Sequence, residues 1–185
     1  IEAAISDYFN KHQLGNNTKL AIACSAGIDS MVLLYTCLKL NIKPYVLHLD
    51  HNWREDSYQA TQFLENFCKE HKLYFISEKL VLPSLYEKSA RDARYEFFTR
   101  SCQGLSIENI LLAHNLDDQA ETVLFRLFRG TNSKGLAGIP ETRMIDGLTI
   151  HRPLLKVSRD QLSNYAAENK INYIHDPSNS DINYA

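Results

Sequence analysis

Short apolar runs alternate with helical periodicity along most of this chain, and this alternation constrains the fold more than any other feature. Four of the runs are continuously apolar, at 20–24, 45–49, 73–76 and 110–113. Continuous runs are typical of strands that are buried on both faces of a parallel sheet. Apolar residues also recur at helical spacing over 60–71 and 116–128. The pattern predicts an α/β fold in which a doubly wound, mostly parallel sheet carries helices on both faces.

The composition is that of a folded protein and excludes several classes. The chain has 185 residues, 44% of them hydrophobic, and a net charge of -2. No apolar run approaches the roughly 18 residues of a membrane span, and the start shows no signal peptide. The cysteines lie far apart without a C-x-x-C pair, so they predict neither a metal knuckle nor a disulfide framework, and a reducing compartment is expected. They are Cys24, Cys37, Cys68 and Cys102.

The second half of the chain no longer follows the strand–helix alternation of the first half. A glycine-rich stretch covers 130–138, and 143–150 is typical of a hairpin closed on Asp146 and Gly147. Ser158 and Gln161 form a capping-box pattern that opens a last helix, ending near position 169. We expect one domain over 1–185, with a core at about 18–130 and an extension of loop, hairpin and helix over 131–185.

The segment between the run at 20–24 and the next helix is a candidate phosphate cradle. Small residues at a strand-to-helix junction let backbone N–H groups face an anion, and the helix N-terminus favours negative charge. Asp29 and Ser30 precede the helix that carries Leu33, and their acceptors suit its unpaired N–H groups. A plain turn is the alternative, since the segment lacks both G-K-S/T and G-x-G-x-x-G. The candidate residues are Ser25, Ala26, Gly27, Ile28, Asp29 and Ser30.

A polar cluster follows the run at 45–49. Ligands of open parallel sheets bind beyond the carboxyl ends of the strands, so this cluster and the candidate cradle are expected to line one crevice. We expect Asp50, His51 and Arg54 to contribute to nucleotide binding. A solvated turn is the alternative.

Acidic residues open the helix after the run at 110–113. Asp118 and Glu121 share one helix face, and His114 precedes them at the same strand end. Such a group can hold Mg²⁺ against phosphate oxygens, with Asp29 as a third carboxylate, or can orient a base. Acids that only complement the helix dipole are the alternative.

Two arginines share a helical face earlier in the chain. Arg91 and Arg94 suit charge neutralisation on a leaving phosphate. A mixed-charge surface helix is the alternative.

Taken in order, these segments resemble the tRNA(Ile)-lysidine synthetases, a family of PP-loop enzymes. The resemblance covers about positions 20–179. One position departs from the family's S-G-G-x-D-S loop, because Ala26 stands where the pattern has glycine; if that position needs a positive φ or touches a phosphate, the methyl would strain or crowd the loop. The matching segments are S-A-G-I-D-S at 25–30, L-D-H-N-W-R-E-D-S at 49–57, A-R-D-A-R-Y at 90–95, A-H-N-L-D-D-Q-A-E-T at 113–122, R-L-F-R-G-T at 126–131, G-L-A-G-I-P at 135–140, H-R-P-L-L at 151–155 and D-P-S-N at 176–179.

The resemblance implies a reaction with ATP and Mg²⁺ as cofactors. ATP would adenylate the carbonyl oxygen at carbon 2 of the wobble cytidine in tRNA(Ile) with a CAU anticodon and release pyrophosphate, and the amino group of free lysine would then attack carbon 2 and displace AMP. It also implies catalytic roles for Asp29, Arg91, Arg94, His114, Asp118 and Glu121, whose division of labour stays open. The resemblance also implies a cytoplasmic protein, or a stromal one if the gene belongs to a plastid.

A basic stretch in the second half is the expected tRNA contact. Residues 119–160 carry a net charge of +3, whereas the segments on either side are acidic. Phosphate contacts need such a surface, and a solvated face is the alternative. The candidates are Arg126, Arg129, Lys134 and Arg152.

Two other functions remain as alternatives. One is a different PP-loop tRNA-modifying enzyme of the thiolation type, although the cysteine spacing does not suit it. The other is a regulatory ATP-binding domain without catalysis, which the fold alone does not distinguish. We expect the family's C-terminal tRNA-binding domains to lie outside this chain; the lysine pocket and the oligomeric state, with a homodimer as one option, are left open.

Overall fold

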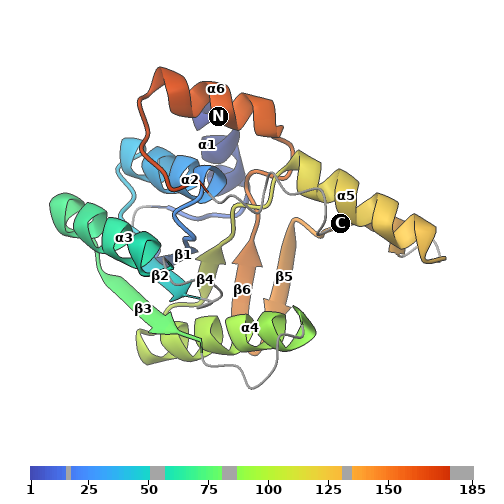
Figure 1. Cartoon of the computed structure of the whole chain (residues 1–185), viewed down its shortest axis with the longest axis horizontal. Coiled ribbons are helices and arrows are strands. Elements are labelled where there is room, and N and C mark those ends of the chain that lie inside the picture. The colour runs from blue at the N-terminus through green and yellow to red at the C-terminus, as the bar shows by residue number, and fades with distance from the viewer. Residues whose placement is uncertain (16–17, 51–56, 81–86, 131–134, 176–185) are drawn as a thin grey trace.

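A six-stranded sheet in the order β3-β2-β1-β4-β6-β5 forms the centre of the molecule (Figure 1). The computed structural model describes residues 1–15, 18–50, 57–80, 87–130 and 135–175. Its elements are α1 (Glu2–Lys11), β1 (Leu20–Ala23), α2 (Ile28–Lys39), β2 (Tyr45–Asp50), α3 (Tyr58–His71), β3 (Phe75–Lys79), α4 (Glu87–Gly104), β4 (Asn109–Leu111), α5 (Leu116–Phe128), the 3-10 turn η1 (Gly135–Ala137), β5 (Thr142–Ile145), β6 (Leu148–His151) and α6 (Arg159–Glu168).

Five of the six strands run in the same direction and only β5 runs against them, which confirms the predicted fold class. β1 pairs with β2 and β4, and β4 pairs in parallel with β6. The predicted hairpin is confirmed as β5 and β6, an antiparallel pair turning at Asp146 and Gly147. Because β6 joins β4, the hairpin extends the central sheet, and the end of β6 lies in line with the ends of β1 and β4.

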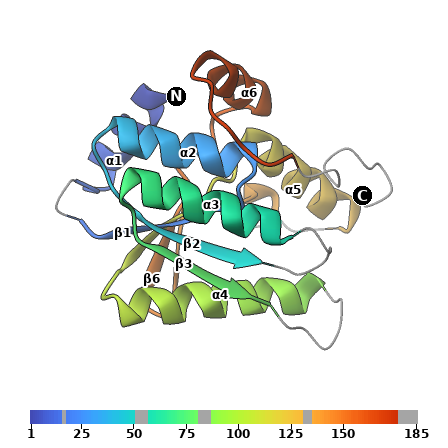
Figure 2. The ribbon, with the colours of Figure 1, turned by 60° about the vertical axis from the view of Figure 1, so that its left-hand side comes forward.

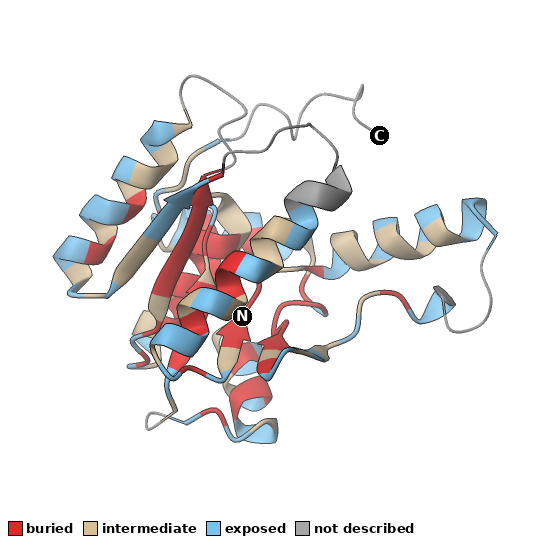
Figure 3. Cartoon of the chain, turned by 90° about the horizontal axis from the view of Figure 1, so that it is seen from below, coloured by how far each residue is buried: buried red, intermediate tan, exposed pale blue. Residues whose placement is uncertain are grey.

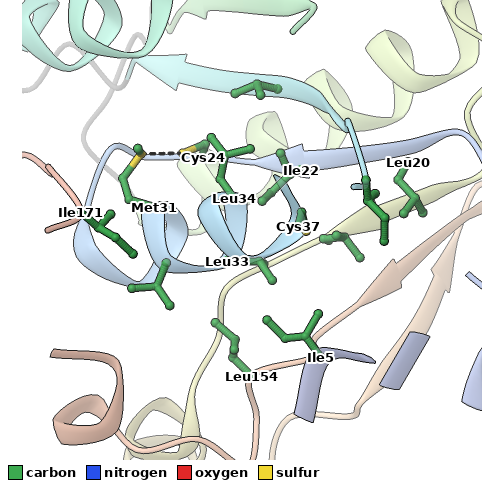
Figure 4. Packing of buried hydrophobic residues seen from close by; sticks show 14 of the residues in the cluster. Ile5, Leu20, Ile22, Cys24, Met31, Leu33, Leu34, Cys37, Leu154 and Ile171 are labelled. Atoms are coloured by element: carbon green, nitrogen blue, oxygen red, sulfur yellow. Dashed lines mark hydrogen bonds between the residues drawn. The ribbon is translucent and has the colours of Figure 1, made fainter. Parts of the chain in front are cut away.

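Different helices cover the two faces of the sheet (Figure 2), and each face has its own cluster of buried hydrophobic residues. Helices α1, α2, α3 and α6 cover one face, where Ile22, Leu33 and Leu154 are fully buried (Figure 4). Helix α4 covers the other face, where Phe97, Phe98, Ile110 and Ile150 belong to one buried cluster. Among the helices of the described residues, none is long and apolar enough to cross a membrane.

Two predicted boundaries are wrong for physical reasons. The strand expected at 73–76 lies at Phe75–Lys79, because Lys72 adopts a left-handed conformation and ends α3 there. β3 is an edge strand, so it does not need the continuous burial on which the prediction relied. Helix α2 begins at Ile28 and is capped by Gly27 without a side-chain hydrogen bond, so Asp29 and Ser30 lie inside the helix rather than before it.

Candidate functional site

The candidate phosphate cradle joins β1 to α2 and is held by its own hydrogen bonds. The Ser30 hydroxyl donates to the Gly27 carbonyl at 2.9 Å and accepts from the Ser25 amide at 3.2 Å. The Ser25 hydroxyl accepts from the Gly27 amide at 3.3 Å. The two hydroxyls therefore shape the loop, and Ser30 is buried while Ser25 is exposed.

Ala26 has the left-handed conformation that the family's glycine suggested. Its φ is +68°, in the region that favours glycine. Its side chain is fully buried in the core, and its carbonyl accepts from the Ile174 amide at 2.9 Å. The backbone of Ala26 is thus strained, but its methyl group packs into the core.

Strand β2 fixes the residue that precedes the loop. The Cys24 amide donates to the Leu47 carbonyl at 2.9 Å, and His48 Nδ1 donates to the Cys24 carbonyl at 2.8 Å. His48 is buried against Phe75, and burial lowers its pKa. No local pattern pointed to His48, because its partner lies 24 positions away.

Asn115 connects the loop helix to the acidic helix α5. It is fully buried, and its Nδ2 donates to Asp29 Oδ2 at 3.2 Å. Its Oδ1 accepts from the Asp118 amide at 3.0 Å, and Asp118 Oδ2 accepts from the Asn115 amide at 2.9 Å. The pair forms a capping box that begins α5. The sequence prediction omitted Asn115, although the spacing N-x-x-D before an apolar helix was a usable signal.

The electrostatics at Asp29 suit a cation. Burial raises the pKa of the Asp29 carboxyl, and the charge of Asp118 raises it further. Asp29 Oδ1 is buried without a hydrogen-bond partner within the described ranges. A divalent cation would satisfy this oxygen and offset the repulsion between the two carboxylates.

The predicted third carboxylate is not part of this arrangement. Glu121 is exposed on α5, and the described residues contain no group of three acidic, histidine or cysteine side chains arranged to hold a metal. Asp29 and Asp118 are therefore the two carboxylates that fit Mg²⁺, which keeps several water and phosphate ligands and needs few from the protein.

His114 lies among arginines at the end of β4. Burial lowers its pKa to about 4, and the charges of Arg152, Arg94 and Arg91 act in the same direction. Its ring is therefore neutral at pH 7, and its Nδ1 is buried without a partner in the described part of the chain. A neutral imidazole here can accept a hydrogen bond or a proton.

The predicted tRNA-contacting arginines divide into two groups. Arg152 is only 3% exposed, so its side chain is buried, and its assignment as a tRNA contact stays a prediction. Arg126 donates to the Gly138 carbonyl at 2.9 Å. Arg129, the residue that caps the C-terminus of α5, is exposed, and its guanidinium lies 4.2 Å from the Phe125 ring centre. Lys134 lies outside the described residues.

The nucleotide-binding prediction after β2 is described only at its first residue. Asp50 is buried at the end of β2, where it accepts a hydrogen bond from the Ser57 hydroxyl at 3.2 Å. His51 and Arg54 lie outside the described residues.

Fold and site together define a class: an α/β domain whose strand–loop–helix cradle and bridged carboxylates meet at the carboxyl ends of two neighbouring parallel strands. The family described as PP-loop domain matches residues 1–185. The chain belongs to this family of ATP-binding domains.

Its curated relatives include tRNA(Ile)-lysidine synthases. That of Francisella tularensis subsp. tularensis (strain WY96-3418) is 37% identical over 89% of this chain, and that of Chlamydia muridarum is 34% identical over 91%. The matches span 42% and 54% of those proteins, so the chain covers about half the length of these relatives. Among solved structures, the U34-tRNA thiolase NcsA from Methanococcus maripaludis has the same fold, with a TM-score of 0.78, 19% identity, and coverage of 94% of this chain and 63% of that one.

Proposed function

We propose that this domain ligates free lysine to carbon 2 of the wobble cytidine of tRNA(Ile) with a CAU anticodon. The relatives named tRNA(Ile)-lysidine synthase support the choice of reaction. The structural observation that most directly supports this reaction is the hydrogen-bonded bridge from Asp29 through Asn115 to Asp118. This bridge joins the phosphate cradle to the acidic helix α5.

The first step is adenylation. The cytidine oxygen on carbon 2 attacks the α-phosphorus of ATP, and pyrophosphate leaves. We propose that the Ser25–Ser30 loop binds pyrophosphate through backbone N–H groups and the α2 N-terminus. Arg91 and Arg94 neutralise the charge that develops on the leaving group.

Asp29 and Asp118 would hold Mg²⁺ in this step. When bound, the ion supplies positive charge to the phosphate oxygens and balances the two carboxylates. The unpartnered Asp29 Oδ1 supports this assignment.

The second step is attack of the lysine amino nitrogen on carbon 2, which displaces AMP. The amine must first lose a proton, and neutral His114 or a carboxylate of Asp118 or Glu121 is suited to accept it. Adenylation makes this step possible because AMP is a better leaving group than the original oxygen.

The outer half of α5 is the proposed contact for the anticodon stem. Arg129 is exposed there and Arg126 lies one turn earlier, with Lys134 following. Replacing Arg129 by alanine should weaken tRNA binding and reduce its salt dependence, because a phosphate contact releases counterions. Unchanged affinity and salt slope would remove α5 from the interface.

A reducing compartment such as the cytoplasm suits this function. All four cysteines are free and buried, and none is paired in a disulfide. The same burial disfavours the thiolation alternative, which needs accessible sulfur ligands.

The test is incubation with ATP, L-lysine and tRNA(Ile) carrying the CAU anticodon. We expect AMP release and lysine incorporation in equal amounts, and neither product with a tRNA whose wobble cytidine is replaced by uridine. AMP release without lysine incorporation would assign a different acceptor. Sulfur incorporation would establish the thiolation alternative.

Two variants test the residue assignments in the same assay. Asp118→Asn keeps an acceptor for the Asn115 amide but loses the negative charge, and Arg94→Ala removes a cation; both should abolish AMP release. Asp117→Asn is the matched control, since Asp117 accepts from the Arg159 amide at 2.8 Å and has no assigned catalytic role. Near-normal turnover of Asp118→Asn or Arg94→Ala would contradict the assignment.

A further inference from the structure

Arg159 lies next to the carboxylates of the site, on a helix that the proposed reaction steps do not involve. It is the first residue of α6, which follows β6 as α5 follows β4, and these two parallel strands point to the same edge of the sheet (Figure 1). Its guanidinium lies 3.9 Å from Asp118 Oδ1. The start of α6 therefore adds a cation to the two carboxylates that fit Mg²⁺.

The main chain around Arg159 is fixed on α5. The Leu116 amide donates to the Val157 carbonyl at 2.9 Å, and the Arg159 amide donates to Asp117 Oδ2 at 2.8 Å. Both hydrogen bonds use main-chain atoms of the segment that begins α6, so they do not depend on where the Arg159 side chain points. The Cα of Arg159 therefore keeps its place beside Asp118 while the end of its side chain is free to turn.

The guanidinium of Arg159 is held weakly where it lies. The side chains of Arg159 and Asp118 are 47% and 29% exposed, and a partly exposed ion pair contributes less than about 1 kcal/mol. Among the described residues, no acceptor forms a hydrogen bond with the N–H groups of this guanidinium. A planar fork of N–H donors suits the oxygens of a phosphate better than one carboxylate oxygen at this distance.

The charges at the two carboxylates favour an exchange of partners. Burial and the charge of Asp118 raise the pKa of the Asp29 carboxyl, and the charge of Arg159 opposes them. Arg159 thus offsets part of the repulsion between Asp29 and Asp118. Carboxylates that bind a divalent cation no longer need this help, and the cation repels the guanidinium. The phosphates proposed to bind at the Ser25–Ser30 loop are then the anions available to Arg159 at this edge of the sheet.

We propose that Arg159 is a nucleotide-binding residue that changes its partner. Its guanidinium pairs with Asp118 as long as this carboxylate holds no divalent cation, and it donates to an oxygen of the ATP phosphates once Asp118 binds one. The inference rests on the proposed ATP and Mg²⁺ sites, and it needs neither RNA nor lysine. It makes the start of α6 the third contributor to the phosphate site, after the loop before α2 and the acidic turn of α5.

Two binding measurements by calorimetry test the exchange, one with Mg²⁺ alone and one with α,β-methylene-ATP at saturating Mg²⁺. Arg159→Gln should bind Mg²⁺ alone about twofold to fivefold more tightly, because the competing cation is gone. The same variant should bind the ATP analogue about tenfold more weakly, because a charge-assisted hydrogen bond is lost. A residue that only stabilised the fold would move both affinities in the same direction.

A second variant and a control separate charge from geometry. Arg159→Lys keeps the positive charge but loses the planar fork, so it should bind Mg²⁺ as the parent does and the ATP analogue about threefold more weakly. Lys156→Gln is the matched control, because it removes an equal charge at an exposed position shortly before α6. An exposed charge away from the carboxylates is screened, so both affinities should change by less than about twofold.

Several results would overturn the proposal. Weaker binding of both ligands by Arg159→Gln would show that the residue only supports the position of Asp118. Tighter Mg²⁺ binding with unchanged affinity for the analogue would make it a counterion alone, and two unchanged affinities would leave it no part in the site. If Arg159→Gln does not fold, Arg159→Lys decides, since unchanged affinity for the analogue there contradicts the exchange.

The proposed reaction is tested separately. Failure of lysine incorporation with the predicted binding pattern intact would refute the reaction and leave the role of Arg159 in place. A parent chain that incorporates lysine while Arg159→Gln binds both ligands normally would refute the role of Arg159 and leave the reaction.

Discussion

Helices α2 and α5 begin side by side but continue in different environments. Both follow neighbouring parallel strands, and the Asp29–Asn115 hydrogen bond joins their first turns. Beyond that point, α2 buries seven residues in the core, whereas α5 has no buried residue (Figure 3). The helix that presents the phosphate cradle is therefore fixed by packing, and the helix that presents Asp118 is fixed by hydrogen bonds at its first turn.

The largest expected effect is a difference in stability between substitutions in α2 and in α5. Leu33 of α2 is fully buried, and Leu33→Ala should lower the free energy of unfolding by about 2–5 kcal/mol, because it leaves a cavity. Leu124 of α5 is 54% exposed, so Leu124→Ala should change the free energy of unfolding by less than about 0.5 kcal/mol. Urea denaturation measures both, and equal losses would show that α5 is packed in solution.

The second prediction concerns the anchor of the cradle. His48→Leu removes the donor to the buried Cys24 carbonyl and should lower stability by about 1–3 kcal/mol. His48→Asn can place an amide donor near the position of Nδ1 and should recover part of this loss. We expect the leucine variant to lose affinity for pyrophosphate more than for RNA. A loss of stability without any change in pyrophosphate affinity would show that His48 supports only the core.

The sequence predicted the central strands and the helix faces because both depend on local apolar patterns. It placed β3 two residues early, since an edge strand with exposed Ser77, Glu78 and Lys79 does not follow the pattern of a buried one. It identified Asp29, His114 and Asp118 as chemical groups at strand ends, and the sheet brings these ends together.

The residues that organise the site were harder to predict. His48 holds a carbonyl group 24 positions away, and no local pattern records such a partner. Arg152 was counted in the basic stretch expected to contact tRNA, because a charge count by segment does not reveal that its side chain is buried. Glu121 shares a helix face with Asp118 in sequence, but Asp118 is tied back to the cap while Glu121 is exposed.

The third prediction concerns Asn115, whose side chain links α2 to α5. Asn115→Ala removes the cap of α5 and should cost about 1 kcal/mol of stability. The same change removes the side chain that bonds to both Asp29 and Asp118, so these carboxylates lose their fixed positions. Because a displaced catalytic group slows the reaction, the rate of AMP release should fall by at least about tenfold. Ser158→Ala is the matched control, because Ser158 caps α6 in the same kind of capping box. Equal activity in the two variants would show that Asn115 serves only as a cap.

The smallest expected effect is at Ala26. A left-handed backbone costs an L-residue about 1–2 kcal/mol, so Ala26→Gly relieves strain. The same change removes a buried methyl group worth about 0.8 kcal/mol and adds backbone freedom to the unfolded chain. These contributions oppose each other, so the free energy of unfolding should change by less than about 1 kcal/mol.

Pyrophosphate binding distinguishes strain from crowding at this position. Because the Ala26 methyl packs in the core, Ala26→Gly should leave pyrophosphate affinity unchanged. The contrasting change is Gly27→Ala, whose added Cβ would lie 3.3 Å from the Ser25 hydroxyl and disturb its bond to the Gly27 amide, so affinity should fall. A large gain in affinity for Ala26→Gly would mean that the methyl reaches the phosphate after all, and that the departure from the family's glycine weakens ATP binding.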